Sequence, residues 1–548
     1  MPTAITSDTL RRRLRTAQFF MLRYETEFTP CTGITAVNKQ ERRNFSNGVV
    51  LAPWCPALKR KSPADDPVAS GKVRALGWSF KAGDFLCEVM VTTDDLAPIV
   101  FLSVPGRFRG VETPYDTPAE APDHDPAATL RMDALVFGLA VDVLLRDVGN
   151  GRQFVWAADW ETVPAMWLVR ERHLTALTLH NTFDECLSVQ AWRFGERFAA
   201  FNQTSTRHHG YVTALELGID TADVVTTVNR GFAFGMRQEP LLRDVMAGHL
   251  RDFLPRVVGI NNAAFAPLDP KLVELRQALE ADPATGLKQL LARKEKALAE
   301  MPAEIKAKAK GKAIVASMGR RVSQKQHDVL VEAVRWMLRE NEHAPILVIF
   351  STVHGDTGSP ARLQRMEELA EEFPDNVVCI DGFLKFFSAL MAAADFNCMP
   401  SLYEPHGGAY DGTVVPIARA VDGLAEQICA LHPQGEAERL NGVWHTPDEA
   451  PTGFLFREPV SMEHLPHHEL RELLSQSPTP WNWVFRSMCE SLKETLKEAV
   501  AVRLERPEVY AKLVLAALRK QEGTSWLVNL GGILGLVEAA RVRIETQE

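Results

Sequence analysis

The chain has 548 residues, of which 46% are apolar and 24% are charged, and its formal net charge is −9 at neutral pH. This length exceeds what one hydrophobic core supports, so we expect two or more domains of an ordinary globular protein. The negative net charge argues against a general nucleic-acid surface, and no apolar run is long enough to span a bilayer.

The eight cysteines are scattered along the chain, and none forms a Cys-x-x-Cys pair. Several of them lie in apolar runs, as buried free thiols of a reducing compartment do. The N-terminus lacks the apolar core of a signal peptide. We therefore expect a cytoplasmic protein that has neither a nucleic acid nor a membrane as its partner.

The first half of the chain alternates apolar runs with helical patterns. A turn with Gly33 at its centre follows the first run, and apolar residues recur at helical spacing between residues 130 and 146. The predicted strands cover residues 18–24, 49–53, 98–104, 153–157, 176–180 and 223–228. Such alternation indicates βαβ units and a mainly parallel sheet.

A second alternating series follows a segment between domains at residues 261–269 and charged helical stretches at about 272–299. Its predicted strands cover residues 313–318, 346–351, 377–380 and 396–399, with helical patterns at 326–339 and 362–372. Residues 481–548 are predicted to be helical only. Two successive doubly wound halves predict a cleft between them, with ligands beyond the carboxyl ends of the strands.

Polar side chains fall where predicted strands end in both halves. Asp159 and His180 follow strands of the first series, and Arg320, Lys325 and Glu404 follow strands of the second. Taken singly, Asp159 suits a helix N-cap, His180 a satisfied histidine at a strand end, and the two cations a solvated face. Their shared place at the rim of the predicted cleft favours one functional site instead.

The stretch from residue 395 to residue 408 carries the most specific chemistry. Glu404 stands just before Gly407 and Gly408, and paired glycines let a backbone approach a ligand and offer N–H groups to an anion. Arg320 can bind phosphate oxygens through its planar fork, and Lys325 adds a point charge. These groups suit sugar transfer from a nucleotide, with Glu404 on sugar hydroxyls. The alternative is an ordinary strand-to-helix turn with a solvated glutamate.

Short motifs recur along most of the chain in a fixed order. They are WAADWET at 156–162, LTLHN at 177–181, ADVVTTV at 222–228, VGINN at 258–262, GRRVSQK at 319–325, ADFNCMPSLYEP at 394–405, VPIARAVDGLA at 415–425, TGFLF at 452–456 and SW at 525–526. In this order and spacing they resemble the bacterial glycogen synthase and plant starch synthase family. These proteins are retaining glycosyltransferases of the GT-B fold.

The resemblance implies an α/β fold with two Rossmann-like doubly wound domains facing a central cleft. Residues 1–262 would form the acceptor-side domain and residues 263–548 the nucleotide-sugar domain, and a last helix at about 525–543 would cross back to the first. It also implies a hexosyltransferase that moves glucose from ADP-glucose or UDP-glucose to the non-reducing end of an α-1,4-glucan. No metal or other cofactor is expected.

The resemblance also implies residue roles. Glu404, which would hold the donor glucose, His180, near the reacting sugar, and Asp159, on the acceptor side, are the predicted catalytic residues. Arg320 and Lys325 would bind the donor diphosphate. The other predicted donor-binding residues are Gly33, Phe383, His406, Gly407 and Gly408. Phe383 corresponds to an aromatic residue beside the base, and filling a core is its alternative role.

The chain departs from the family pattern at several positions. Cys31 replaces a lysine, Glu161 replaces a histidine, and the segment from Glu404 to Pro416 is some four residues shorter, about one helical turn. Two further hypotheses therefore stay open. One is a diverged, non-catalytic member that binds glucan or nucleotide, and the other is a GT-B glycosyltransferase with a different donor or acceptor.

Overall fold

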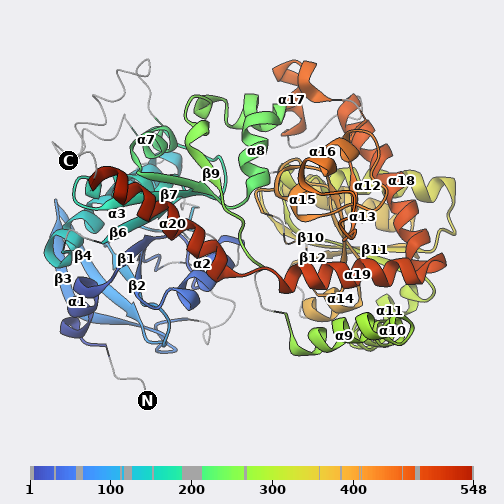
Figure 1. The fold of residues 1–548 in the computed structure, drawn as a ribbon, viewed down its shortest axis with the longest axis horizontal. Helices are drawn as coiled ribbons and strands as arrows, with labels where there is room; N and C mark the ends of the chain where they lie inside the picture. The colour runs from blue at the N-terminus through green and yellow to red at the C-terminus, as the bar shows by residue number, and fades with distance from the viewer. Residues whose placement is uncertain are drawn as a thin grey trace. The chain divides into compact units, whose positions relative to one another are not determined.

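The computed structural model divides the chain into two compact units (Figure 1). Unit 1 comprises Met1–Val228, His249–Phe265 and Trp526–Glu548, and unit 2 comprises Asn229–Gly248 and Ala266–Ser525. The structure describes residues 5–29, 33–56, 58, 66–110, 114–115, 126–150, 153–187, 213–264, 268–356, 358–382, 386–406, 408, 410, 412–459, 461–475 and 482–545.

Unit 1 is built on a nine-stranded sheet in the order β3-β4-β5-β2-β1-β6-β7-β8-β9. All neighbouring strands are parallel except β3 with β4 and β4 with β5. The elements are α1 (Ser7–Thr16), β1 (Phe19–Leu22), α2 (Gly33–Asn44), β2 (Gly48–Pro53), β3 (Val73–Ala82), β4 (Phe85–Thr92), β5 (Ile99–Ser103), α3 (Pro126–Val148), β6 (Phe154–Ala158), α4 (Val163–Val169), β7 (Leu174–Leu179), α7 (Ala214–Thr221), β8 (Val224–Thr227), β9 (Val257–Gly259) and α20 (Trp526–Glu545).

The central strands of unit 1 are buried on both faces. Every residue of β1, β2, β6 and β8 is buried, as a parallel sheet covered by helices requires. A chain of side-chain hydrogen bonds crosses three of these strands: Trp156 Nε1 donates to Thr178 Oγ1 at 2.7 Å, and Thr178 Oγ1 lies 2.7 Å from Thr226 Oγ1. The mainly parallel sheet predicted from the sequence is confirmed, and the β3–β4 hairpin was missed.

The last helix of the chain packs on the sheet of unit 1. Leu530, Ile533 and Val537 of α20 share a core cluster with strand residues such as Phe154 and Trp156. Asn529 Nδ2 donates to the carbonyl of Asn261 at 2.9 Å, and Trp526 Nε1 donates to the carbonyl of Ala264 at 2.9 Å. The helix expected at about residues 525–543 therefore belongs to the unit formed by the N-terminal half.

Unit 2 is built on a six-stranded, all-parallel sheet in the order β12-β11-β10-β13-β14-β15. The elements are α8 (Arg230–Gln238), α9 (Pro270–Ala281), α10 (Pro283–Ala299), α11 (Ala303–Ala309), β10 (Ala313–Arg321), α12 (His327–Glu340), β11 (Ile346–His354), α13 (Ser359–Glu372), β12 (Val377–Asp381), α14 (Phe387–Ala393), β13 (Phe396–Met399), β14 (Val415–Arg419), α15 (Asp422–Gln427), α16 (Glu436–Trp444), β15 (Phe454–Phe456), α17 (His467–Leu473), α18 (Trp483–Glu505) and α19 (Pro507–Glu522).

Helix α8 corrects the predicted assignment of residues 1–262 to one domain, because it belongs to unit 2. Arg230 Nε lies 2.7 Å from Glu426 Oε1, and the N–H of Gly231 donates to Glu426 Oε2 at 2.7 Å. A Cβ atom on Gly231 would lie 2.2 Å from the backbone oxygen of Asp422, so this packing of α8 on α15 requires glycine at that position. The predicted boundary between residues 262 and 263 lies just before the division that follows Phe265.

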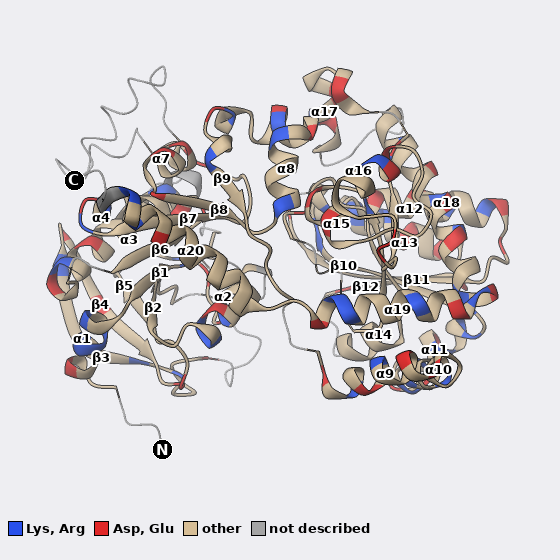
Figure 2. Ribbon diagram, in the orientation of Figure 1, with Lys and Arg blue, Asp and Glu red and all other residues tan. Residues whose placement is uncertain are grey.

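Acidic and basic residues occur together on the outer helices of unit 2, including α10 and α18 (Figure 2). Unit 2 also contains buried charge: Arg419 pairs with Glu458 through two hydrogen bonds, of 3.0 and 2.6 Å, and Arg457 pairs with Glu239 at 2.6 Å. Within the described ranges, no helix is both long enough and apolar enough to cross a membrane.

Candidate active site

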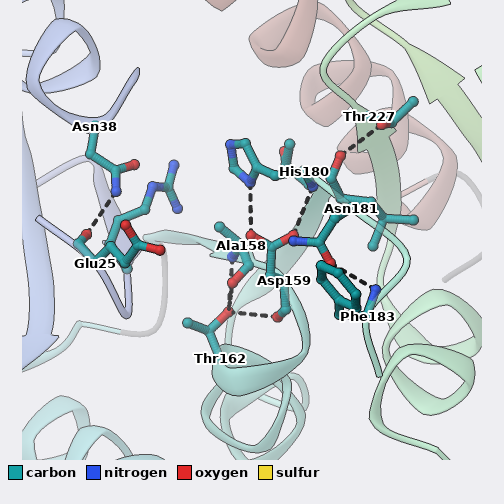
Figure 3. A network of polar contacts seen from close by, with 12 residues as sticks. Glu25, Asn38, Ala158, Asp159, Thr162, His180, Asn181, Phe183 and Thr227 are labelled. Atoms are coloured by element: carbon teal, nitrogen blue, oxygen red, sulfur yellow. Dashed lines mark hydrogen bonds and ion pairs between the residues drawn. The ribbon is translucent and has the colours of Figure 1, made fainter. Parts of the chain in front are cut away.

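Asp159 and His180 meet at one edge of the sheet of unit 1. Strands β6 and β7 are parallel neighbours, so the residues that follow Ala158 and Leu179 lie side by side. Asp159 Oδ1 accepts the backbone N–H of His180 at 2.7 Å, and Asp159 Oδ2 lies 3.0 Å from His180 Nδ1 (Figure 3). Because a carboxylate only accepts, Nδ1 carries the proton, and Nε2 is the ring atom left to a ligand.

Asp159 lies in a turn with an unusual backbone conformation. Its φ of 58° and ψ of 177° are unusual for a residue with a side chain, and such conformations cluster at functional sites. Thr162 supports the turn from below, since its hydroxyl accepts the N–H of Ala158 at 2.8 Å (Figure 3). Asp159 is 7% exposed and His180 is 8% exposed, so their contact is shielded from water.

Burial and charge act in opposite directions on His180. Burial lowers its pKa, while the charge and hydrogen bond of Asp159 raise it, and the pKa ends above its ordinary value. Nearby Glu161 is also buried, and burial together with the charge of Asp159 raises its pKa well above the usual range of a carboxyl group. Glu161 therefore favours its neutral, hydrogen-bond-donating form.

Two further residues of this region were missed in the sequence. Tyr115 Oη donates to Glu25 Oε1 at 2.5 Å, and burial followed by the charge of Glu25 raises the pKa of Tyr115 well above its usual value. The backbone of Glu25 is held by Asn38, whose Nδ2 donates to its carbonyl at 2.7 Å (Figure 3). A signal for Glu25 existed, because it follows β1, the neighbour of β6.

In unit 2, the structure brings Lys325 and Glu404 together. Lys325 Nζ donates to Glu404 Oε2 in a short ion pair, and the hydroxyl of Ser401 donates to the same oxygen at 3.1 Å. The side chain of Glu404 is 10% exposed and that of Lys325 is 26% exposed. The carboxylate is thus largely buried, and the ammonium group reaches it from the solvent side.

The loop after β10 and the loop after β13 support this pair through their backbones. The N–H of Leu402 donates to the carbonyl of Gln324 at 2.8 Å, and Gln324 Nε2 donates to the carbonyl of Tyr403 at 3.1 Å. The N–H of Glu404 donates to Asp422 Oδ2 at 3.0 Å. The position of Glu404 is therefore fixed by three separate segments of unit 2.

The two adjacent arginines at the end of β10 have different environments. Arg321 is 3% exposed, and its Nη1 lies 2.5 Å from Asp381 and 3.1 Å from Thr352 Oγ1, so its role is structural. Arg320 is exposed, and within the described residues no carboxylate pairs with it. Of the two, Arg320 is the guanidinium group that an anion can reach.

The remaining predicted donor-binding residues are only partly described. Gly33 begins α2 rather than lying at the centre of a turn, so it contributes to a helix N-terminus whose N–H groups lack intrahelical partners. His406 is held by α15, since Gln427 Nε2 lies 2.8 Å from His406 Nδ1. Gly408 is exposed. Cys31, Phe383 and Gly407 lie outside the described residues.

Comparison with known proteins finds similarity to glycogen and starch synthases. A model of the starch synthase catalytic domain matches residues 45–250. The chain is 26% identical over 319 residues to a glycogen synthase of Lacticaseibacillus casei, covering 54% of this chain and 62% of that protein. It is 24% identical over 409 residues to a glycogen synthase of Lactococcus lactis, covering 70% and 73%. The chain thus spans less than two thirds of the first of these relatives.

A solved structure shows the fold. The catalytic domain of starch synthase IV from Arabidopsis thaliana, bound to ADP and acarbose, is similar to this chain with a TM-score of 0.56 and 16% sequence identity. The match covers 91% of this chain and 99% of that chain. The predicted α/β architecture of GT-B type, with two Rossmann-like halves, is confirmed.

Proposed function

We propose that this chain is a diverged member of the glycogen and starch synthase family and acts as a retaining hexosyltransferase. Its similarity to starch and glycogen synthases supports this proposal. It moves glucose from ADP-glucose or UDP-glucose to the non-reducing end of an α-1,4-glucan. One observation carries the proposal: past the carboxyl ends of β10 and β13 in unit 2, Lys325 pairs with Glu404, and Arg320 at the end of β10 is exposed. This edge is where sheets of this class bind nucleotides.

Arg320 and Lys325 bind the donor diphosphate in this proposal. The planar guanidinium group of Arg320 accommodates two phosphate oxygens, and Lys325 adds a mobile positive charge. As the sugar leaves, negative charge grows on the diphosphate, and the two cations stabilise it. Loss of one such donor typically raises the barrier by about 2.7–4 kcal/mol.

Glu404 holds the donor sugar through its hydroxyl groups. Its carboxylate cannot favour a diphosphate beside it, so the ammonium group of Lys325 separates the two charges. The hydrogen bond from the Ser401 hydroxyl to the carboxylate, and the one from the Glu404 N–H to Asp422, keep Glu404 in place while the sugar changes shape. We propose that the leaving phosphate accepts the proton of the acceptor hydroxyl on the same face, with no metal ion in the transfer step.

His180 and Asp159 act on the acceptor side. Asp159 fixes the imidazole by two hydrogen bonds and directs Nε2 toward the sugar hydroxyls. The raised pKa of His180 favours the charged ring, which stabilises oxygen atoms that gain negative charge. In this proposal, loss of either carboxylate-containing pair impairs transfer.

Release of nucleotide diphosphate tests the proposal. The purified chain is incubated with glycogen and a panel that includes ADP-glucose, UDP-glucose and other nucleotide sugars. The proposal expects release that requires glycogen, continues without added divalent metal, and is lost in Glu404→Ala. The donor that supports release identifies the base. No release with any donor from folded protein would contradict it.

A second candidate is a non-catalytic member that binds glucan or nucleotide. The observation that favours it is the direct Lys325–Glu404 ion pair, in which the two donor-binding groups neutralise each other. Glucan binding without turnover, unchanged in Glu404→Ala, would support this candidate. Release that does not need glycogen would instead favour a GT-B glycosyltransferase with another acceptor.

We also propose a cytoplasmic location. It is supported by Cys87, Cys379, Cys398, Cys429 and Cys489, which form no disulfide bond within the described part of the chain. Free thiols of this kind persist in reducing compartments. Lysis of cells directly into denaturant with an alkylating reagent, followed by mass analysis of the protein, would test this, because the denaturant exposes buried thiols and only disulfide-bonded cysteines would then resist the reagent.

A further inference from the structure

Unit 2 contains three metal-binding side chains that the proposed transfer does not use. Cys429, His445 and Glu449 each offer one donor atom, and these atoms all lie within 4.8 Å of one another. Cys429 is 4% exposed and His445 is 7% exposed, while Glu449 is half-buried. A thiolate, an imidazole and a carboxylate together form a ligand set typical of zinc.

Both ring nitrogens of His445 face an acceptor oxygen. Its Nε2 lies 3.1 Å from the carbonyl oxygen of Ala425, which only accepts, so Nε2 carries a proton. Its Nδ1 faces Glu449 Oε2 at 3.0 Å, and an ionised carboxylate also only accepts. Either Nδ1 carries a second proton, or a cation lies between the lone pair of Nδ1 and that of Glu449 Oε2.

The geometry of this pair fits a tetrahedral ion. Two ligands at about 2.0–2.1 Å from one tetrahedral ion lie roughly 3.3 Å apart, close to the 3.0 Å found here. A backbone carbonyl that holds the other ring nitrogen is the usual outer-shell partner of a metal-binding histidine. The contact between Nε2 and Ala425 supplies this partner.

The fold delivers the three side chains from separate segments. Cys429 follows α15, and its N–H donates to Thr452 Oγ1 at 3.0 Å. His445 is the C-cap residue of α16. Glu449 ends the turn that follows, and its N–H donates a hydrogen bond to the carbonyl of Thr446. The two oxygens of the Glu449 carboxylate have different partners. Lys520 Nζ of α19 donates to Oε1 at 3.0 Å, and Oε2 faces His445.

Cys429 completes the set. Its Sγ lies 3.6 Å from the backbone carbonyl of Glu449 and donates to it as a thiol. A divalent ion binds a cysteine as the thiolate and releases its proton.

We propose that Cys429, His445 and Glu449 form a binding site for one divalent ion of the zinc type, with a fourth position open to water. The site ties the segment after α15 to the end of α16 and, through Lys520, to α19. It also supports the segment that follows Glu404, because Tyr410 Oη donates to the carbonyl of Gln427 and lies 3.0 Å from Thr452 Oγ1.

Cobalt and zinc binding to the metal-free full-length chain tests this inference without any measurement of transfer. We expect one Co²⁺ per chain with a sulfur-to-cobalt charge-transfer absorption, its displacement by Zn²⁺, and a higher Tm with Zn²⁺. Cys429→Ser should abolish the absorption, and Glu449→Gln should weaken Zn²⁺ binding about tenfold or more. Cys379→Ser, a thiol of β12 in the same unit, is the matched control and should change neither.

A second measurement needs no variant. In the wild-type chain, Zn²⁺ should slow alkylation of Cys429, which peptide mapping identifies, while leaving Cys379 unaffected. Absence of the charge-transfer absorption, its persistence in Cys429→Ser, or alkylation of Cys429 that is insensitive to Zn²⁺ would overturn the proposal. Each of these results would leave an imidazolium–carboxylate pair as the explanation of the contact between His445 and Glu449.

Discussion

The two carboxylate pairs, Asp159 with His180 in unit 1 and Lys325 with Glu404 in unit 2, are built in opposite ways. Asp159 bonds twice to the same residue, once to its backbone and once to its ring, and both side chains are at most 10% exposed. Lys325 reaches Glu404 by one contact at the end of a flexible side chain that is 26% exposed. The first pair is rigid, and the second is exchangeable.

The difference matches the roles that we propose. A rigid pair keeps the histidine in one orientation before any ligand arrives, so little entropy is lost on binding. An exchangeable pair neutralises Glu404 in the free protein and leaves Lys325 able to move onto a phosphate oxygen. The four predictions that follow test this contrast, from the largest expected effect to the smallest.

The largest effect is expected from Arg320→Ala. Loss of a guanidinium group that meets the developing charge should lower kcat about 10²–10³-fold with little change in stability, because Arg320 is exposed. Steady-state kinetics with the preferred donor measures this. Arg339→Ala removes an exposed arginine of an ion pair on α12 and should leave kcat unchanged. Equal effects of the two variants would contradict a role of Arg320 in transfer.

Asp159→Asn tests whether the first pair is rigid because of its charge. Asp159 raises the pKa of His180 against the effect of burial. The contact between the charged ring and Asp159 therefore stabilises the folded state fully below the unfolded pKa of about 6.5, and this stabilisation is lost as pH rises through the folded pKa. The variant should lose about 1.5–3 kcal/mol of stability at low pH and less at high pH.

Urea unfolding of wild type and Asp159→Asn between pH 5.5 and pH 9 measures this difference. Asp147→Asn breaks an exposed pair with Arg11 and serves as the control. Charges of Arg23 and Glu41 also act on His180, and both remain in the variant. A loss of stability that is the same at both ends of the pH range would show that the hydrogen bonds, and not the charge, hold the ring.

The stability of Glu161→Gln relative to wild type should increase as pH rises. The pKa of Glu161 is raised by burial and by Asp159, so the native state keeps a proton that the unfolded state loses above about pH 4.3. Wild-type stability should therefore fall relative to the variant by up to about 1.4 kcal/mol per pH unit until the native pKa is reached. Thermal unfolding from pH 4 to pH 8 tests this, and a difference that does not change with pH would exclude it.

The smallest effect is expected from Ser401→Ala. The hydroxyl of Ser401 donates one hydrogen bond to Glu404, and its loss should cost about 0.5–1.5 kcal/mol, which is roughly 2–10-fold in kcat/KM for the donor. Ser46→Ala changes an exposed serine of unit 1 and is the control. A hundredfold loss in Ser401→Ala would mean that the second pair is as rigid as the first.

Much of the fold could be predicted from the sequence because parallel strands and helices leave distinct periodic patterns. The strand ends at Asp159, His180 and Lys325 were correctly placed for this reason. The hairpin of β3 and β4 was missed because many of its residues are exposed, so its apolar signal is weak. The membership of α8 in unit 2 was not predictable, since it depends on packing against Asp422, about 190 residues away in the sequence.

The four residues Asp159, His180, Lys325 and Glu404 were predicted from strand ends and motifs, but their pairing was not. Glu25 belongs to no motif and is placed by the neighbouring strand. Cys429, His445 and Glu449 have no recognisable metal-binding spacing, because Cys429 follows α15 whereas His445 and Glu449 lie at the end of α16 and in the turn after it. The roles proposed for Phe383 and Gly407 stay predictions.

The linkage formed on glycogen tests the central proposal most directly. Nucleotide sugars labelled in the glucose moiety are incubated with glycogen and the wild-type chain, and the polymer is then digested with β-amylase, which releases maltose from non-reducing α-1,4-linked ends. We predict labelled maltose from wild type, about a hundredfold less or lower still from Arg320→Ala, and none from Glu404→Ala under the same conditions. Label that stays off the polymer, or that β-amylase cannot release, would contradict a retaining α-1,4-glucan synthase.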